Sequence, residues 1–307
     1  MKLGVSHGRI VEVRDGRYLG RGPGTSVLEP LGEVQGELDA VEWQLPFPVA
    51  DYVDFYSSRG HAENMGRMFR PDAEPLTPNW LHLPIGYHGR AGTVVVSGTD
   101  VKRPHGHRGP GDFGPSRKLD IELELGFVIG EPSEGPVPVE RALEHVFGVV
   151  LVNDWSARDI QAFEYVPLGP FLGKSFATSI SPWVVTLDEL ARVQGEPQEP
   201  PPVDHLRIEP FAFDIPLEVE LNGGVISRTN ARHLYWNVAQ QIAHLTSNGA
   251  TLRRGDLLAS GTISGFGEHE RGSLIELTWN EGPFLEDGDE VVLRGEGLGE
   301  VRGRIVA

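Results

Sequence analysis

Residues 149–174, VVLVNDWSARDIQAFEYVPLGPFLGK, bring several reactive polar groups into one short segment. An apolar run predicts a buried strand that ends at Asp154, and the following residues predict a helical turn that carries Arg158 and Gln161. A loop rich in proline and glycine then presents Lys174. A carboxylate, a guanidinium, an amide and an ammonium group in this arrangement are typical of a site that binds an oxyanion beside a metal.

A second acidic pattern lies in residues 119–130, LDIELELGFVIG, where acidic residues recur at every second position. Glu122 and Glu124 therefore leave the same face of a predicted strand, with Cα atoms about 6.6 Å apart. Like charges this close repel each other, so the pair requires either a solvated face or a bound cation. The opposite face is apolar, which indicates a half-buried strand and leaves both interpretations open.

Asp54, which precedes a predicted helix, and Asp154 complete a set of four candidate carboxylates with Glu122 and Glu124. Ligands that are all oxygen are typical of hard cations such as Ca²⁺ and Mg²⁺. Zinc is disfavoured, because the chain has no cysteine and no pair of histidines spaced HxxxH. No EF-hand or P-loop pattern is present.

The histidines give a weaker signal than the carboxylates. His61 is one of 11 histidines, and a single histidine is more often structural than catalytic. His105 and His107 have a spacing that suits metal ligands, but they lie in a loop rich in glycine and proline and are expected to be solvated. The GTISG segment, residues 261–265, suits a close approach of the backbone to a ligand. It is not a GxSxG nucleophile elbow, because Ile263 is at its centre.

The elements that must position these groups are mostly strands, so we expect a mainly β (α+β) fold. Helices are expected after Ser57-Ser58, at residues 139–148 and at residues 234–249, and residues 103–117 and 195–204 are expected to be loops. Strands are expected at residues 8–13, 17–20, 93–98, 119–130, 149–154 and 181–185 and in a hairpin at 216–230, and strands with turns are expected at 256–267, 273–280 and 289–297.

Composition limits the possible partners. The formal net charge of −17 makes nucleic acid and anionic membranes poor partners. An anionic small molecule would need a locally cationic pocket, and of the four lysines only Lys174 has an apolar, glycine-rich setting. No stretch approaches 18 consecutive apolar residues, and the first residues lack the pattern of a signal peptide, so we expect a cytoplasmic protein.

The chain length predicts one large domain with a small one. Residues 1–48 are expected to form a small β module with a turn at Asp15-Gly16, and Pro46 and Pro48 mark its end. Residues 49–307 would then form the catalytic domain.

From residue 51 to the C-terminus, long motifs resemble the fumarylacetoacetate hydrolase family. The resemblance implies a catalytic domain with a mixed β-sandwich roll, an SH3-like barrel before it, and a homodimer. The N-terminal module is shorter than that of the family and would be a truncated barrel. The matching segments are DYVDFYSSRGHAENMGRMFR, PNWLHLPIGYHGRAGTVVVSGT, KLDIELELGFVIG, VNDWSARDIQAFEYVPLGPFLGKSFATSISPWVV and GDLLASGTISG.

The resemblance also implies a role for each site residue. His61 would be the general base and Glu276 its orienting carboxylate, although the FGEHERG loop before Glu276 differs from that of the family. The metal ligands would be Asp54, Glu122, Glu124 and Asp154, holding Ca²⁺, or alternatively Mg²⁺ or Mn²⁺, with a second Mg²⁺ near Asp154, Lys174 and Thr178. Arg158, Gln161 and Lys174 would stabilise an oxyanion, and the substrate contacts would be Tyr56, Arg70, Tyr87, Gln161, Tyr165 and Thr262.

The implied substrate is a small anionic diketo acid, 4-fumarylacetoacetate. Hydrolysis of its carbon–carbon bond gives fumarate and acetoacetate, the last step of tyrosine and phenylalanine breakdown. One alternative is an acylpyruvate hydrolase, decarboxylase or isomerase related to this family, which could use the same carboxylates. A different class of alternative, a β-sandwich binding module with a structural Ca²⁺, would leave His61, Arg158 and Lys174 without a role.

Overall fold

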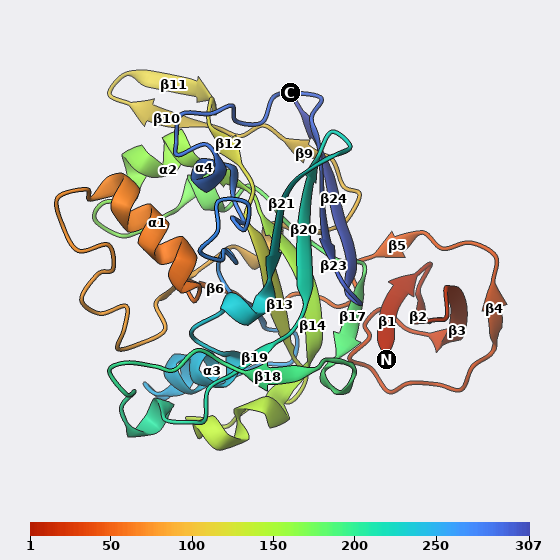
Figure 1. Ribbon diagram of the computed structural model, residues 1–307. Coiled ribbons are helices and arrows are strands. Elements are labelled where there is room, and N and C mark those ends of the chain that lie inside the picture. Colours follow the sequence, from red (N-terminus) through yellow and green to blue (C-terminus); the bar gives the residue numbers. More distant parts are fainter.

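The computed structural model describes residues 1–307 and consists mainly of strands, with few helices around them, which confirms the expected fold class (Figure 1). A large sheet of 13 strands forms the centre. Its main path runs through β4 (Gly36–Leu38), β3 (Arg17–Pro23), β2 (Arg9–Arg14), β1 (Lys2–Ser6), β17 (Trp183–Thr186), β14 (Val146–Asp154), β13 (Leu123–Ile129), β22 (Leu257–Ala259), β6 (Tyr52–Phe55) and β7 (Gly86–His88). The strands off this path are β16 (Thr178–Ile180), β8 (Val94–Val96) and β5 (Trp43–Gln44).

A second sheet of five strands packs against β14. Its order is β21 (Gly224–Asn230), β20 (Pro216–Leu221), β23 (Glu290–Gly295), β24 (Gly299–Val306) and β9 (Val101–Lys102). Three short pairs complete the strands: β10 (His105–Gly109) with β11 (Asp112–Pro115), β12 (Leu119–Asp120) with β15 (Ser156–Ala157), and β18 (Arg192–Gln194) with β19 (Phe211–Phe213).

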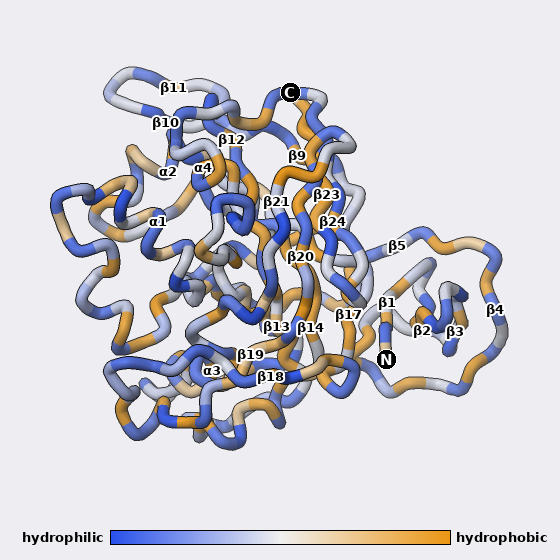
Figure 2. The backbone as a smooth tube through the Cα atoms, in the orientation of Figure 1, coloured by the Kyte–Doolittle hydropathy of each residue, from blue (hydrophilic) through white to orange (hydrophobic).

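The strands β13 and β14 are buried on both faces, because a hydrophobic core lies on each side of them. Leu125 and Leu151 belong to the larger core, which they share with Leu293 of the second sheet. Val128 and Val152 point to the opposite face and belong to a smaller core. In Figure 2, hydrophobic stretches run along these central strands, while much of the outer loops is hydrophilic. The pleat of a strand sends neighbouring side chains to opposite faces, so the parity of a residue number here decides which core it faces.

The N-terminal strands extend the large sheet, because β1 pairs antiparallel with β17. Leu3, Val5 and Phe47 pack into the smaller core beside the central strands. The predicted turn at Asp15-Gly16 is present, and both residues have positive φ, 51° and 74°. The boundary at residue 48 and the relation of this module to an SH3-like barrel stay predictions.

The four α-helices are α1 (Arg59–Phe69), α2 (Arg158–Glu164), α3 (Val238–Thr246) and α4 (Leu274–Leu277). Helix α1 follows Ser58, as predicted, but the Ser58 hydroxyl donates a hydrogen bond to the Ser264 carbonyl instead of capping the helix. Helix α3 begins with a capping box formed by Asn237 and Gln240. None of the helices has the length and apolar composition needed to cross a bilayer.

The expectation of a strand at residues 273–280 is wrong, because α4 occupies most of this segment. The alternating apolar side chains of SLIELTWN suit a strand, but a side chain distant in the sequence accepts hydrogen bonds from the backbone of this segment. The two carboxylate oxygens of Asp120 accept hydrogen bonds from the N–H groups of Leu274, at 2.7 Å, and Ile275, at 3.2 Å. These are free donors of a first helical turn, so the contact stabilises a helix there.

Three other segments differ from the expectation. Residues 103–117 are not all loop, because β10 and β11 form a hairpin in which Gly106 lies closely against Ile160 of α2. The expected helix at 139–148 is a 3₁₀ helix, η2 (Val139–His145), followed directly by β14. The expected strand at 119–130 is divided into β12 and β13. The other 3₁₀ helices are η1 (Ala91–Thr93), η3 (Leu172–Lys174), η4 (Leu187–Glu189), η5 (Asp204–Leu206) and η6 (Ala231–His233).

Candidate active site

The four candidate carboxylates come together because strand parity and register place them on one face of the large sheet. Glu124 on β13 and Asp154 on β14 point to the same side as the smaller core, and so does Asp54 on β6. The strand β22 lies between β6 and β13 in the sheet. Glu122, in the break between β12 and β13, continues the alternation of Glu124. We call these four residues the carboxylate cluster.

The carboxylate cluster is buried, which excludes the interpretation of Glu122 and Glu124 as a solvated strand face. Glu122 is 5% exposed, Asp54 is 2% exposed, and the other two side chains have no exposed surface. One oxygen from each residue lies within 4.8 Å of the others. Asp54 Oδ1 and Glu124 Oε1 have no hydrogen-bond partner although they are buried. Unpartnered buried oxygens at this spacing fit a bound cation.

The remaining oxygens of the cluster are held by neighbouring donors. The Lys174 ammonium lies 2.5 Å from Glu122 Oε2 and also pairs with Asp154 Oδ2. The Tyr87 hydroxyl donates to Asp54 at 2.8 Å or to Asp154 at 3.1 Å. These contacts fix the direction of the carboxylates, so the free oxygens keep their positions.

Two further donors come from loops and strand ends. The Thr178 hydroxyl donates to Asp154 Oδ1 at 2.9 Å. The Gly261 N–H donates to Glu124 Oε2 at 3.0 Å, and Gly261 has φ of +77°, which favours glycine. The GTISG turn therefore brings its backbone close to the carboxylate cluster, while its close approach to a ligand stays a prediction. A second magnesium site near Asp154, Lys174 and Thr178 stays a prediction.

The negative charge of the four carboxylates exceeds the positive charge of their cationic neighbours. Burial and the nearby Asp154 raise the pKa of Asp54, and burial and Asp54 raise the pKa of Glu124. Burial would also raise the pKa of Glu122, but Lys174, then Arg158 and His61, lower it below its ordinary value. Two of the carboxylates thus resist ionisation where no cation is present. A divalent cation held by the cluster would remove this excess negative charge.

His61 and Glu276 form a buried pair beside the cluster. His61 comes from α1 and lies with its Nδ1 2.7 Å from Glu276 Oε2 on α4. Burial would raise the pKa of Glu276, but its pairing with His61 and its hydrogen bonds lower the pKa to about 2. Glu276 is therefore an ionised acceptor at neutral pH. Nδ1 of His61 must carry the hydrogen, which leaves Nε2 free as an acceptor when the ring is neutral.

Three hydrogen-bond donors to Glu276 were missed by the sequence reasoning. Asn64 donates at 2.9 Å, Ser264 at 2.9 Å and Ser273 at 2.7 Å. Ser264 lies in the GTISG turn and Ser273 just before α4, so both stand beside segments that the sequence had marked. Helical spacing would have marked Asn64, because it lies one turn after His61 on α1.

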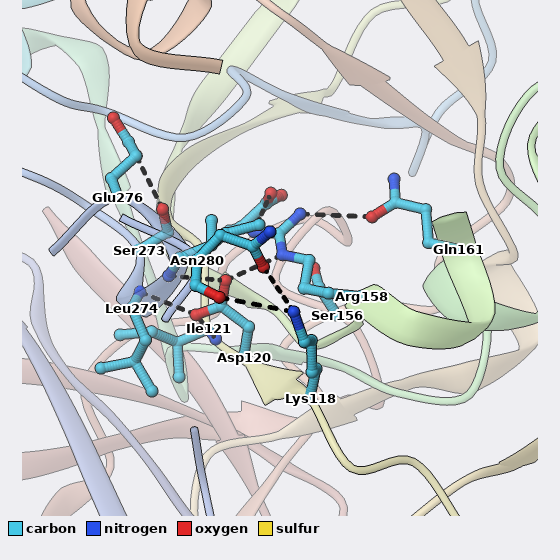
Figure 3. A network of polar contacts seen from close by, with 12 residues as sticks. Lys118, Asp120, Ile121, Ser156, Arg158, Gln161, Ser273, Leu274, Glu276 and Asn280 are labelled. Atoms are coloured by element: carbon cyan, nitrogen blue, oxygen red, sulfur yellow. Dashed lines mark hydrogen bonds and ion pairs between the residues drawn. The ribbon is translucent and has the colours of Figure 1, made fainter. Parts of the chain in front are cut away.

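Arg158 contacts the carboxylate cluster and also residues outside it, and Figure 3 shows its contacts with Asp120 and Gln161. Its Nη2 lies 2.7 Å from Glu122 Oε1, its Nε donates to Asp120 Oδ2 at 2.8 Å, and its Nη1 donates to Gln161 at 3.3 Å. Nη2 is buried at ion-pair distance but makes no hydrogen bond of good geometry. Asp120 was missed as a site residue, although it continues the alternation of Glu122 and Glu124 in the sequence.

The expected substrate contacts are spread around this centre. Tyr56 stacks edge-on against the His61 ring at 5.3 Å, and Tyr87 contacts the cluster directly. The Thr262 hydroxyl is buried without a partner, which leaves it able to bind a ligand. Arg70 and Tyr165 are exposed, and the Arg70 guanidinium is engaged by the Pro75 carbonyl at 2.7 Å. The roles of all these residues stay predictions.

Comparisons with known proteins identify relatives of this chain. The family model described as the C-terminal region of fumarylacetoacetate (FAA) hydrolase matches residues 51–306. The chain is 48% identical to the fumarylacetoacetase of Homo sapiens over 297 residues, covering 85% of this chain and 71% of that protein. It is also 48% identical to the fumarylacetoacetase of Arabidopsis thaliana, covering 88% of this chain and 72% of that protein.

Solved structures share the fold at lower sequence identity. A fumarylacetoacetate hydrolase from Exiguobacterium antarcticum has a TM-score of 0.71 and 22% identity, covering 100% of this chain and 99% of that one. A 5-carboxymethyl-2-hydroxymuconate delta-isomerase from Mycobacterium smegmatis has a TM-score of 0.67 and 21% identity, covering 100% and 98%.

The raised pKa values of Asp54 and Glu124 predict how metal binding depends on pH. A cation requires ionised ligands, so binding should release protons and become tighter as the pH rises towards these pKa values. Glu124→Gln removes one charge and should weaken binding at least about 10- to 100-fold. Calorimetric titration with Ca²⁺, Mg²⁺ and Mn²⁺ at two pH values, in buffers of different ionisation enthalpy, measures both effects.

The matched control is Glu134→Gln, because Glu134 is an exposed glutamate in a loop. This variant should bind metal as the parent does. An unchanged dissociation constant for Glu124→Gln, or binding that weakens as the pH rises, would remove Glu124 from the proposed ligand set.

Proposed function

The chain belongs to the fumarylacetoacetate hydrolase family, and on this premise we propose how its site performs the reaction. The reaction is hydrolysis of the carbon–carbon bond of 4-fumarylacetoacetate to fumarate and acetoacetate, the last step of tyrosine and phenylalanine breakdown. The identity with fumarylacetoacetases over most of the chain carries this conclusion. The isomerase among the structural neighbours shares less than a quarter of its residues and indicates the fold alone.

The carboxylate cluster would hold Ca²⁺, Mg²⁺ or Mn²⁺ through Asp54, Glu122, Glu124 and Asp154. Buried oxygens without partners support this ligand set. When bound, a divalent cation supplies Lewis-acid stabilisation of the enolate that leaves as the carbon–carbon bond breaks. Lys174 and Tyr87 would keep the carboxylates oriented in its presence.

His61 would activate the attacking water. In the neutral ring, the Nδ1–H group donates a hydrogen bond to Glu276. Nε2 is therefore free to take a proton from water. The negative charge of Glu276 would then stabilise the imidazolium. Three further donors hold the Glu276 carboxylate, so the ring has a fixed orientation before the substrate binds.

The tetrahedral oxyanion formed by the attack needs hydrogen-bond donors. Arg158, Gln161 and Lys174 line the same region and would supply them, each donor contributing about 10²- to 10³-fold to the rate. The partly unused Nη2 of Arg158 supports this role. Arg70, Tyr165 and Tyr56 would bind the carboxylates and carbonyls of the substrate, with Thr262 as a further donor. The cationic side chains of this site, Arg70, Arg158 and Lys174, lie in a chain of net charge −17. The site would therefore attract an anionic substrate locally.

An exposed apolar segment supports the predicted homodimer. Residues 163–172 run from the end of α2 to the start of η3, and several of their large apolar side chains face solvent in the single chain. Leu168 is 96% exposed, and Val166 and Phe171 are each 68% exposed. A contiguous group of this kind is unusual on a monomer and typical of a contact between protein chains. A second copy of the chain would cover it. A cytoplasmic location stays a prediction.

The function predicts loss of the ultraviolet absorbance of 4-fumarylacetoacetate when the protein is added. A chelator should abolish the activity, and added divalent cation should restore it. An acylpyruvate offered in parallel should be cleaved much more slowly. Equal rates with both substrates would favour the alternative hydrolase, and no cleavage by a metal-loaded sample would contradict the proposed function.

His61→Ala should lower kcat by about 10²- to 10⁴-fold, because it removes the general base. Metal affinity should not change, since His61 is outside the carboxylate cluster. The matched control, His205→Ala, changes an exposed histidine in η5 and should keep the parent rate. A kcat within about tenfold of the parent would show that another group activates the water.

Leu168→Glu should shift the protein from dimer to monomer, because a buried charge in the contact is unfavourable. Light scattering after size-exclusion chromatography measures the mass directly. Val203→Glu is the control, since Val203 is 56% exposed in the proline-rich loop and lies outside the segment. A dimer that persists in Leu168→Glu would place the contact elsewhere on the surface.

A further inference from the structure

We propose that Asp120 is a positioning residue that fixes Arg158 and the helix carrying Glu276 relative to each other. Asp120 is fully buried at the end of β12 and lies outside the carboxylate cluster. Figure 3 shows its side chain between Arg158 on one side and the start of α4 on the other. The inference rests on the proposed function, in which Arg158 stabilises the oxyanion and Glu276 orients the base.

Asp120 uses both of its oxygens in full. Oδ1 accepts from the N–H groups of Ile121 and Leu274, each at 2.7 Å. Oδ2 accepts from Arg158 Nε at 2.8 Å and from the N–H of Ile275 at 3.2 Å. Each oxygen thus accepts one donor from α4, and a second donor from outside that helix. A shift of Asp120 would therefore move the guanidinium and the helix together.

The position of α4 matters because it is only four residues long and carries Glu276 in its first turn. A helix of this length has little stability of its own, so external contacts decide where it lies. Asp120 holds its first N–H groups, and the Arg271 guanidinium donates to the Glu276 carbonyl at 2.7 Å. The direction of the His61 ring follows from Glu276.

Each nitrogen of the Arg158 guanidinium has a different partner, so the contact with Asp120 is specific to one of them. Glu122 and Gln161 contact the two terminal nitrogens, and only Asp120 engages Nε. The backbone N–H of Arg158 also donates to the backbone carbonyl of Lys118 at 2.9 Å. The Lys118 side chain reaches Asn280, just after α4, at 2.8 Å. Lys118 therefore forms a second link, beside Asp120, between the Arg158 segment and the segment of α4. This second link contains no carboxylate.

The change Asp120→Asn tests the inference, because the amide has one acceptor oxygen where the carboxylate has two. Whichever way the amide turns, its NH₂ group faces two N–H donors. One orientation releases Arg158 Nε and Ile275, and the other releases Ile121 and Leu274. Either orientation misplaces a group needed in the transition state, so kcat should fall about 10²-fold with little change in KM. Metal affinity should stay at the parent value.

Double-mutant cycles separate positioning from a general loss of stability. If Asp120 acts through Arg158 or Glu276, its effect should largely disappear in an Arg158→Lys or a Glu276→Gln background. Asp256→Asn is the matched control, because Asp256 is a buried aspartate that accepts the Arg253 N–H at 2.8 Å. It should lower the thermal stability while keeping the parent kcat.

A spectroscopic measurement tests the geometry without the reaction. In protein labelled with ¹⁵N at arginine and histidine, the Arg158 Nε–H and His61 Nδ1–H signals should exchange slowly with solvent. Asp120→Asn should speed the exchange of at least one signal, and Asp256→Asn should change neither. If Asp120→Asn does not fold, Asp120→Ser takes its place, since serine keeps one small acceptor.

The outcomes differ for the two proposals. A kcat within about threefold of the parent with both signals unchanged would overturn the role of Asp120, and so would additive losses in both cycles. A parent protein that does not cleave 4-fumarylacetoacetate would contradict the proposed function. The exchange measurement would still decide whether Asp120 positions Arg158 and His61.

Discussion

The burial of several like charges at one place is the constraint on which the rest of this site depends. Asp54, Glu122, Glu124 and Asp154 lie within a few ångströms of one another with almost no contact with water. The raised pKa values of Asp54 and Glu124 express the cost of this arrangement. The carboxylates persist there because the surrounding sheet fixes their backbone on both sides. The resulting field holds the ammonium of Lys174 and would also favour a bound metal cation.

The proposed hydrolytic half of the site and the half proposed to stabilise the leaving group are electrostatically connected. His61 and Glu276 lie in helices, while the carboxylate cluster lies on strands. The charge of His61 nevertheless contributes to the lowered pKa of Glu122. Arg158 contacts Glu122 on one side and Asp120 on the other, and Asp120 holds the start of α4. One guanidinium and one aspartate thus connect the carboxylate cluster to the proposed base.

Such a site needs rigid support, and the two cores provide it. The central strands β13 and β14 carry two members of the cluster and are packed on both faces. The segment between α2 and η3 lies outside these cores and bears exposed apolar side chains. In the proposed dimer, a second copy would cover these side chains, which lie in the chain between Gln161 and Lys174.

The sequence alone was sufficient for the fold class and for the four candidate carboxylates that the structure brings together, because both leave local patterns. Alternating carboxylates in residues 119–130, the apolar run before Asp154 and the long family motifs are all visible without coordinates. The tertiary structure decided whether the face of Glu122 and Glu124 meets water or a site, since burial depends on which strands become neighbours. It also decided that residues 273–280 form a helix, because the carboxylate that caps it is 154 residues away in the chain. Contacts of this kind are set by strand register and packing, which a local pattern does not contain.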